Sequence, residues 1–207
     1  MTIKAYAYVD GYNLYNGIME PIRDEDHKVI ATPLGKCRWL NLHKYIYSFL
    51  PKDYELVKIH YFTATVRGRP DSKKRQQIFW KALDTLPNLE KQLGNQIPDP
   101  KRGGFLEKQS DVNLALQMYC DAIEGKTNSM ILVCGDSDQV PTIRRIQNLN
   151  RGIELSVIFP PNRFSQDIAD IVSPHYKTRE AILSATQFPD IIKVEGISDI
   201  IKPPEWS

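Results

Sequence analysis

The sequence predicts an α/β fold with a doubly wound, mainly parallel sheet flanked by helices in three layers. Residues 130–134 form a short, wholly apolar run, which is typical of a strand covered on both faces. Along the chain, such runs alternate with segments whose apolar residues recur at helical spacing. This alternation indicates right-handed βαβ units and therefore a parallel sheet.

The expected elements follow from these patterns and from the glycines and prolines that interrupt them. We expect strands at about 3–9, 56–64, 88–96, 129–134 and 153–159. We expect helices at about 40–50, 71–86, 109–125, 139–149, 164–173 and 178–184. The stretch from 10 to about 38 is expected to be rich in loops, and residues 97–108 to form a flexible loop.

Length and composition indicate one globular domain over residues 1–185, followed by an apolar, proline-containing tail at 186–207. The tail has two alternatives: packing back on the domain, or meeting a protein partner or a second copy. No apolar stretch approaches the roughly 20 residues that span a bilayer, so no membrane association is expected. Three widely spaced cysteines, Cys37, Cys120 and Cys134, favour a reducing compartment, and the cytoplasm is the expected location.

Acidic residues are the main functional signal, because they follow predicted strands or begin a predicted helix. Asp10 follows the first strand, Asp136 and Asp138 follow the strand at 129–134, and Asp111 lies in a first helical turn. Each one singly also fits the cap of a helix N-terminus. The carboxyl ends of parallel strands meet at one edge, so the four together favour a metal site for Mg²⁺ or Mn²⁺.

Basic residues are clustered locally, although the net charge of the chain is only +2. Arg67, Arg69 and Lys73 follow the second strand, and Lys101 with Arg102 lies in the expected loop. A solvated face is the ordinary explanation of such clusters. The first cluster follows a strand and would lie on the same rim as the acids, and both clusters are candidates to bind a nucleic-acid backbone.

Three other residues near the acids are candidates with weaker signals. Ser137 is a candidate to support the site by a hydrogen bond or a metal contact, although a capping hydroxyl is the simpler explanation. Tyr12 and Tyr15 suit stacking on bases, or packing against a helix. Dinucleotide-binding, P-loop and nucleophile-elbow motifs are all absent from the sequence, which argues against those chemistries.

Three motifs in order resemble those of one known family. The segment Tyr8-Val9-Asp10-Gly11-Tyr12-Asn13-Leu14 resembles the opening motif of NYN domains, which belong to the PIN-like nuclease superfamily. Residues 107–115 and 133–138 resemble the central and third motifs of that family, and the likeness covers roughly residues 3–175. One departure is Gln139, where relatives often carry an aromatic residue.

The resemblance implies a PIN-like fold and metal-dependent cleavage of RNA, with the acidic roles on Asp10, Asp111, Asp136 and Asp138. It also implies that Asn13 contacts metal-bound water or phosphate. We therefore expect a ribonuclease that hydrolyses phosphodiester bonds, preferably of single-stranded RNA, with Mg²⁺ or Mn²⁺ as cofactor. The alternatives are a regulatory module that binds RNA or metal without cleavage, and a metal-dependent phosphatase for small molecules.

Overall fold

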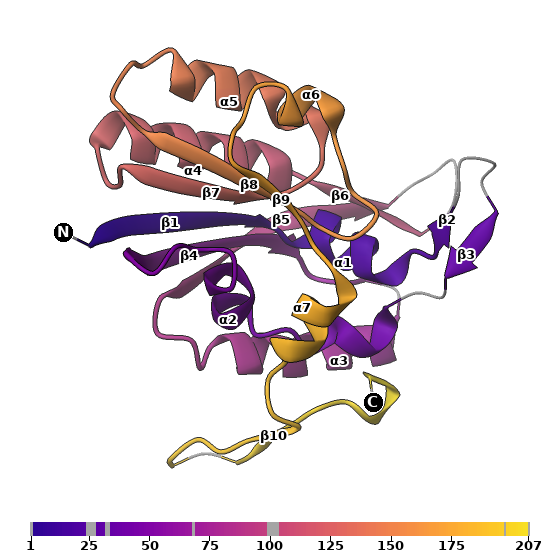
Figure 1. The fold of residues 1–207 in the computed structure, drawn as a ribbon. Helices are drawn as coiled ribbons and strands as arrows, with labels where there is room; N and C mark the ends of the chain where they lie inside the picture. Colours follow the sequence, from indigo (N-terminus) through magenta and orange to yellow (C-terminus); the bar gives the residue numbers. More distant parts are fainter. Residues whose placement is uncertain are drawn as a thin grey trace.

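The computed structural model describes residues 2–23, 28–31, 34–67, 69–98, 104–196 and 198–206. Its centre is a seven-stranded sheet in the order β6-β5-β4-β1-β7-β8-β9 (Figure 1). The strands of this sheet are β1 (Ile3–Asp10), β4 (Tyr54–Ala64), β5 (Leu89–Pro98), β6 (Phe105–Lys108), β7 (Ser129–Val133), β8 (Glu154–Phe159) and β9 (His175–Lys177). Within this sheet the described strands pair in parallel, except β5 with β6, which confirms the mainly parallel α/β fold.

Helices cover both faces of the sheet and give it three layers (Figure 1). One face carries α1 (Gly11–Met19), α2 (Leu42–Tyr47), α3 (Pro70–Leu83) and α7 (Glu180–Ala185). The other carries α4 (Ser110–Glu124), α5 (Val140–Gln147) and α6 (Gln166–Ala169). Successive side chains of β1 pack in opposite cores: Ala7 and Val9 lie on the α1 face, and Tyr8 lies on the α4 face.

Short elements complete the chain. They are the hairpin strands β2 (Ile22–Arg23), β3 (Val29–Ala31), β10 (Ile191–Ile192) and β11 (Ile200–Ile201), and the 3₁₀ turns η1 (Gly35–Arg38), η2 (Ser137–Gln139) and η3 (Pro204–Trp206). None of the described helices combines the length and the apolar character that a membrane crossing requires.

Helix α1 corrects the expectation that loops follow the first strand. Two glycines and two asparagines within its nine residues lower its intrinsic helix propensity, which hid the helix from sequence patterns. Tertiary packing stabilises it, because Leu14 and Ile18, four residues apart, are both buried in the core. The Asp10 side chain caps it by accepting from the Asn13 backbone N–H at 2.9 Å.

Strands β6 and β9 also differ from expectation. The expected loop at 97–108 is wrong at both ends: residues 97 and 98 belong to β5, and β6 at 105–108 pairs with that strand. Strand β9, with three residues, is too short to produce a period-two signal. Residues 99–103 lie outside the described residues.

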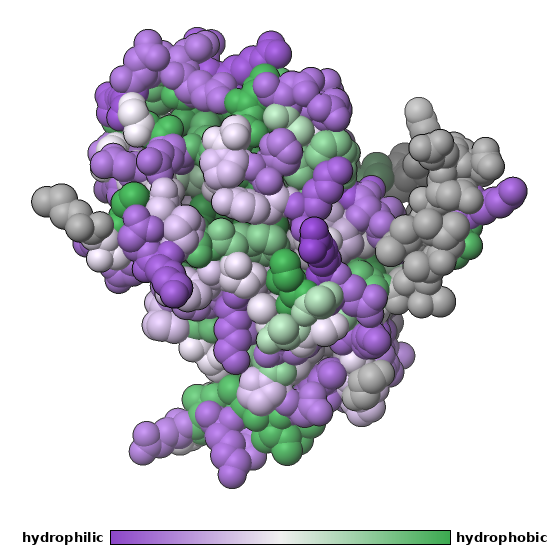
Figure 2. Space-filling model, viewed as in Figure 1, coloured by the Kyte–Doolittle hydropathy of each residue, from purple (hydrophilic) through white to green (hydrophobic). Residues whose placement is uncertain are grey.

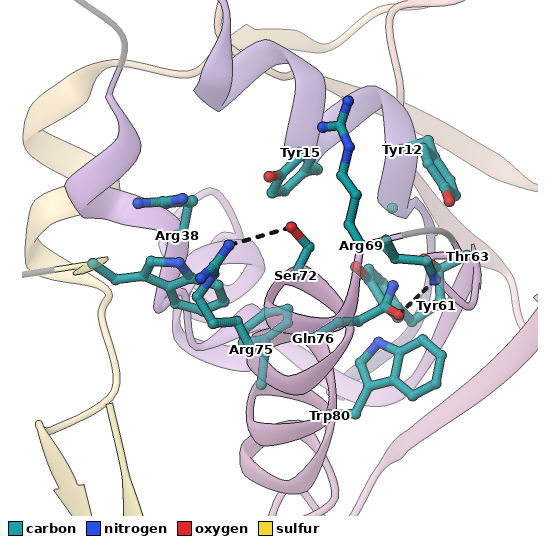
Figure 3. Close-up of a pocket in the computed structure, with 14 residues that line it drawn as sticks. Tyr12, Tyr15, Arg38, Tyr61, Thr63, Arg69, Ser72, Arg75, Gln76 and Trp80 are labelled. Carbon is teal, nitrogen blue, oxygen red and sulfur yellow. Dashed lines mark hydrogen bonds between the residues drawn. The ribbon is translucent and has the colours of Figure 1, made fainter. Parts of the chain in front are cut away.

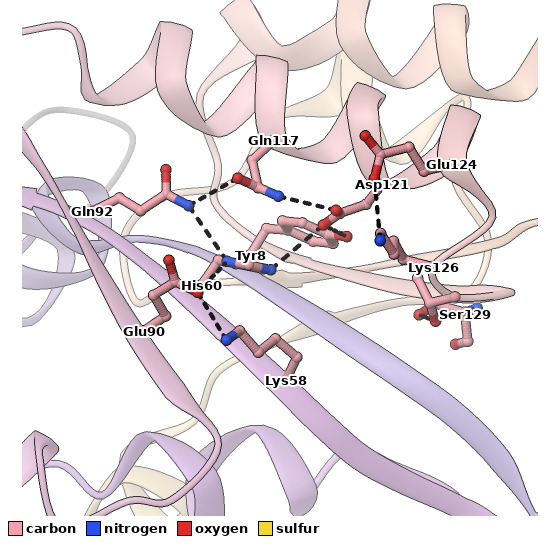
Figure 4. A network of polar contacts seen from close by, with 11 residues as sticks. Tyr8, Lys58, His60, Glu90, Gln92, Gln117, Asp121, Glu124, Lys126 and Ser129 are labelled. Atoms are coloured by element: carbon pink, nitrogen blue, oxygen red, sulfur yellow. Dashed lines mark hydrogen bonds and ion pairs between the residues drawn. The ribbon is translucent and has the colours of Figure 1, made fainter.

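A buried polar network joins the sheet to α4 (Figure 4). Asp121 of α4 accepts from the Tyr8 hydroxyl at 2.8 Å and from the Gln117 amide at 3.0 Å. The His60 Nε2 lies 3.4 Å from Asp121, and Gln92 donates to Gln117 at 2.9 Å. Burial alone would raise the pKa of Asp121, but the polar contacts from His60 and Tyr8 outweigh it and lower the pKa. The network thus fixes α4, the helix that begins beside Asp111.

In the described residues the C-terminal tail packs back on the domain, and the alternative of a protein partner or a second copy stays a prediction. Trp206 lies edge-on to Trp39 and Phe79, with ring centroids 6.1 and 5.9 Å apart. Phe188 also packs on Trp39 at 5.7 Å, and the Trp39 indole donates to the Pro189 carbonyl at 2.9 Å. These contacts make the tail part of the core on the α1 face.

Candidate functional site

The predicted acids lie at the edge of the sheet where its connections diverge. From β1 the chain proceeds to β4 on one side and later returns to β7 on the other. Ligands of open α/β sheets bind in the crevice at such a switch point, beyond the carboxyl ends of the strands. Asp10 ends β1, and Asp136 follows β7 after Cys134 and Gly135.

Asp10 is the most perturbed acid of this edge. Its side chain is 5% exposed, and Cys134 donates its thiol to Oδ2 at 3.4 Å. Burial raises the pKa of Asp10 to about 6, and the charges of Asp111 and Asp136 add to the rise. The hydrogen bond from Asn13 opposes this shift. A buried carboxylate among like charges is favourable only if something positive binds near it.

Asp111 enters the same cluster from the first turn of α4. Although it is exposed, partial desolvation and the charges of Glu107, Asp136 and Asp138 raise its pKa. The residue before the helix, Gln109, has a left-handed backbone with φ of 83°. Such a conformation is costly without glycine, and strain of this kind concentrates at functional sites. Here it sets the direction in which α4 begins.

Asp136, Ser137 and Asp138 form the turn after β7. Asp136 accepts from the Asp138 backbone N–H at 3.0 Å and so caps η2, as the simpler interpretation of this residue expects. Ser137 and Asp138 are exposed. The supporting role of Ser137 stays a prediction.

Asn13 and Cys134 hold the acid-bearing segments together. The Asn13 side-chain oxygen accepts from the Gly135 backbone N–H at 2.9 Å, which ties α1 to the turn after β7. Cys134 contacts Asp10 and also accepts from the Asp136 backbone N–H at 3.2 Å. Burial raises the pKa of Cys134, so it remains a thiol. Sequence reasoning missed this role, because a cysteine ending an apolar strand looks like an ordinary core residue.

The basic candidates lie at the end of β4, the strand next to β1. Arg67 and Arg69 follow this strand and Lys73 lies in α3, and all three are exposed. The Arg67 backbone N–H donates to Gln96 at 2.9 Å, which fixes the loop against β5. Lys101 and Arg102 lie outside the described residues.

A cavity beside the acids was not predicted (Figure 3). It has a volume of about 200 Å³ and lies between α1 and α3. Gly11, the neighbour of Asp10, belongs to its wall, and the other walls are rich in aromatic and arginine side chains. The sequence drew attention to Gly11, Tyr12, Tyr15 and Arg69 of its lining but not to the cavity, because tertiary packing brings the lining together.

Comparison with known proteins identifies the family. The family model described as "NYN domain" matches residues 5–198. The chain belongs to the NYN domain family. The resemblance of the three motifs is thereby confirmed, and the match extends beyond residue 175 into the tail.

This NYN domain is similar to one protein of named activity and to one solved structure. It is 28% identical over 251 residues to 6-hydroxy-3-succinoylpyridine 3-monooxygenase HspA of Pseudomonas putida. This alignment covers 99% of this chain and 75% of the relative. It is also similar to the crystal structure of VPA0982, a protein of unknown function from Vibrio parahaemolyticus. That structure has 19% identity and a TM-score of 0.56, with 86% of this chain and 94% of the other covered. The second likeness supports the fold alone.

The acids of this NYN domain are of the chemical type that binds a divalent cation, but they are not arranged as a ready-made metal site. In the described part of the chain, no three or more His, Cys, Asp or Glu side chains form a ready metal-binding group. However, the donors at the edge are carboxylate oxygens, which Mg²⁺ and Mn²⁺ prefer. Burial raises the pKa values of Asp10 and Asp111, mutual repulsion of the acids adds to the rise, and a bound cation would relieve this repulsion.

Gly135 allows the turn with Asp136 to pack tightly, and this gives a testable prediction. A Cβ at Gly135 would lie 2.0 Å from the Arg163 carbonyl oxygen in the loop after β8. We expect Gly135→Ala to lower the free energy of unfolding by at least about 2 kcal/mol, because backbone must move. Gly35→Ala is the control, since its Cβ would have no neighbour closer than 3.7 Å. Urea unfolding measures both; equal midpoints would contradict the packing argument.

Proposed function

We propose that this NYN domain is a metal-dependent ribonuclease that hydrolyses phosphodiester bonds of single-stranded RNA. Membership of the family implies a nuclease or RNA-related function, since NYN domains are typically nucleases. The observation that carries the finer proposal is the gathering of Asp10, Asp111 and Asp136, whose charges interact at the switch point of the sheet. A cluster that is unfavourable alone is suited to bind a cation and, through it, a phosphate.

The acids differ in environment, and the difference suggests their roles. Asp10 and Asp136 would hold Mg²⁺ or Mn²⁺. When bound, the cation offsets negative charge on the phosphate and makes water a stronger nucleophile. Asp111 is exposed and has a raised pKa, so it is suited to accept the proton of the attacking water. Asp138 would orient that water or bind a second cation.

The other residues of the proposed site hold the acid-bearing segments in place and position the RNA. Asn13 fixes Gly135 and so sets the distance between the segments that carry Asp10 and Asp136. Its predicted contact with metal-bound water or phosphate belongs to this proposal. Arg67, Arg69 and Lys73 would bind phosphates of the RNA strand. Lys101 and Arg102, which lie outside the described residues, are proposed from the sequence for the same role. Contacts of this kind give salt-dependent affinity with little sequence preference.

The test is cleavage of end-labelled single-stranded RNA with Mg²⁺, with Mn²⁺ or with EDTA. We expect cleavage with metal, none with EDTA, and recovery when metal is returned. RNA binding without cleavage under all conditions would favour the regulatory module. Turnover of a small phosphate ester without cleavage of RNA would favour the phosphatase.

A second candidate function is oxygenation of a small aromatic substrate. It is favoured by the likeness to the monooxygenase HspA of Pseudomonas putida, whose alignment covers 99% of this chain, and by a cavity of about 200 Å³ lined with aromatic residues. Such a reaction needs dioxygen and an external reductant. Dioxygen consumption with 6-hydroxy-3-succinoylpyridine and NADH, in a protein that leaves RNA intact, would replace the nuclease proposal.

A further inference from the structure

The cavity between α1 and α3 adjoins the acidic edge and is rigidly built. Gly11 lies in its wall and directly follows Asp10, and the buried Tyr61 of β4 forms part of its lining. The Gln76 side chain joins α3 to the end of β4: it donates to the Ala64 carbonyl and accepts from the Val66 N–H, both at 2.9 Å. The cavity therefore exists before any ligand binds.

Its charge is positive. Arg38, Arg69 and Arg75 project around the same space from η1, from the loop before α3 and from α3 (Figure 3). No carboxylate lines the cavity within the described residues. Glu205, just outside, binds Arg75 at 3.1 Å and offsets one charge, while its backbone carbonyl accepts from Arg38 at 2.8 Å. The remaining charge suits an anion such as phosphate, which guanidinium groups bind well.

Its walls are aromatic, and one of them carries an unsatisfied donor. Tyr15 is 46% exposed at the rim, and Trp80 lines the side formed by α3. Trp206 is 5% exposed, and the Arg38 guanidinium lies over its ring at 5.1 Å. Among the described residues the Trp206 indole N–H has no hydrogen-bond partner. A buried unpaired donor is costly, and an acceptor on a ligand would satisfy it.

We propose that this cavity binds one nucleotide of the RNA strand, with its base among the aromatic side chains and its phosphate on the arginines. The inference rests on the proposed function, since the next phosphate of the strand would then reach the acidic edge. A cavity of about 200 Å³ suits one ring system, because whole drug-sized ligands occupy roughly 300–1,000 Å³. Aromatic walls also distinguish it from a site for phosphate alone.

Calorimetric titration of the full chain with each of the four nucleoside 5′-monophosphates tests the proposal. Adenosine, inorganic phosphate and benzoate are titrated in parallel. We expect at least one monophosphate to bind more tightly than all three. Tyr15→Ala and Arg69→Gln should each weaken its binding about 5-fold or more, because stacking on one aromatic contributes about 1–3 kcal/mol. Both side chains are exposed, so neither variant threatens the fold.

Matched controls lie away from the cavity. Tyr47→Ala removes a tyrosine of similar exposure on α2, and Arg145→Gln removes an exposed arginine on the opposite face. Both should bind the nucleotide as the wild type does. In the cleavage assay, the cavity variants should raise KM for RNA more than they lower kcat.

The outcomes separate this inference from the nuclease proposal. Cleavage of RNA by a protein that binds no monophosphate, or whose cavity variants bind it normally, would overturn the nucleotide site and leave the nuclease intact. Binding that the cavity variants lose, in a protein that cleaves nothing, would support the site and overturn the nuclease. Binding of adenosine, phosphate or benzoate as tight as that of every nucleotide would overturn the inference.

Discussion

Asp136→Asn is expected to reduce metal-dependent RNA cleavage by more than about 100-fold while leaving the fold intact. The variant loses a charge proposed to hold the cation, and even residues that only support metal ligands contribute about 10–100-fold. The asparagine oxygen can still accept from the Asp138 N–H, which preserves the cap of η2. Cleavage rates with Mg²⁺ and Mn²⁺ measure the effect on wild type and variant prepared identically.

Asp53→Asn is the matched control for this experiment. Asp53 is exposed and precedes β4, so it lies at the opposite edge of the sheet from Asp136. The control should cleave RNA at the wild-type rate. Equal rates for Asp136→Asn and wild type would show that the cleavage comes from another site or from a contaminant.

Asp10→Asn is expected to stabilise the metal-free protein at neutral pH. The pKa of Asp10 rises from 3.8 to about 6 on folding, so the folded state favours the protonated carboxyl. The protonated Asp10 therefore contributes fully to the free energy of unfolding below pH about 4. This contribution is lost as the pH rises through about 6, and the loss amounts to about 3 kcal/mol. Asparagine does not ionise and can still cap α1. The variant should therefore match wild type at pH 4 and exceed it above pH 6.

Urea unfolding in EDTA between pH 4 and 7.5 checks this difference. Returning Mg²⁺ at pH 7 should stabilise the wild type more than Asp10→Asn, since a ligand that binds only the folded state stabilises it. A constant difference between the two proteins across this pH range would mean that Asp10 does not ionise as its burial implies.

The strands and the acids that follow them were predictable because their signals are local. An apolar run that ends in Gly135 and Asp136 identifies both a buried strand and the residues at its carboxyl end. The edge on which Asp10 and Asp136 meet then follows from parallel topology alone. The same reasoning located the start of α4 and therefore Asp111.

The remaining features depend on contacts between distant segments and leave little local signal. Helix α1 is stabilised by burial of Leu14 and Ile18 rather than by propensity. The cavity depends on Trp206, which reaches Arg38 only because the tail folds back. Cys134 looks like any core residue until its contact with Asp10 is known. Sequence patterns report periodicity, and none of these contacts is periodic.

The central position of β1 also has a consequence for how the chain folds. Ala7 pairs with Ile59 of β4 on one side and with Ile131 of β7 on the other. Both strands that flank β1 are therefore synthesised long after it. Such non-local pairing slows folding, because loop-closure entropy is lost before the contacts form. During synthesis, the sheet edge that brings Asp10 and Asp136 together therefore cannot form until β7 has been made and has paired with β1. The proposed active site is therefore assembled late in folding, although Asp10, its first residue, is among the earliest to be synthesised.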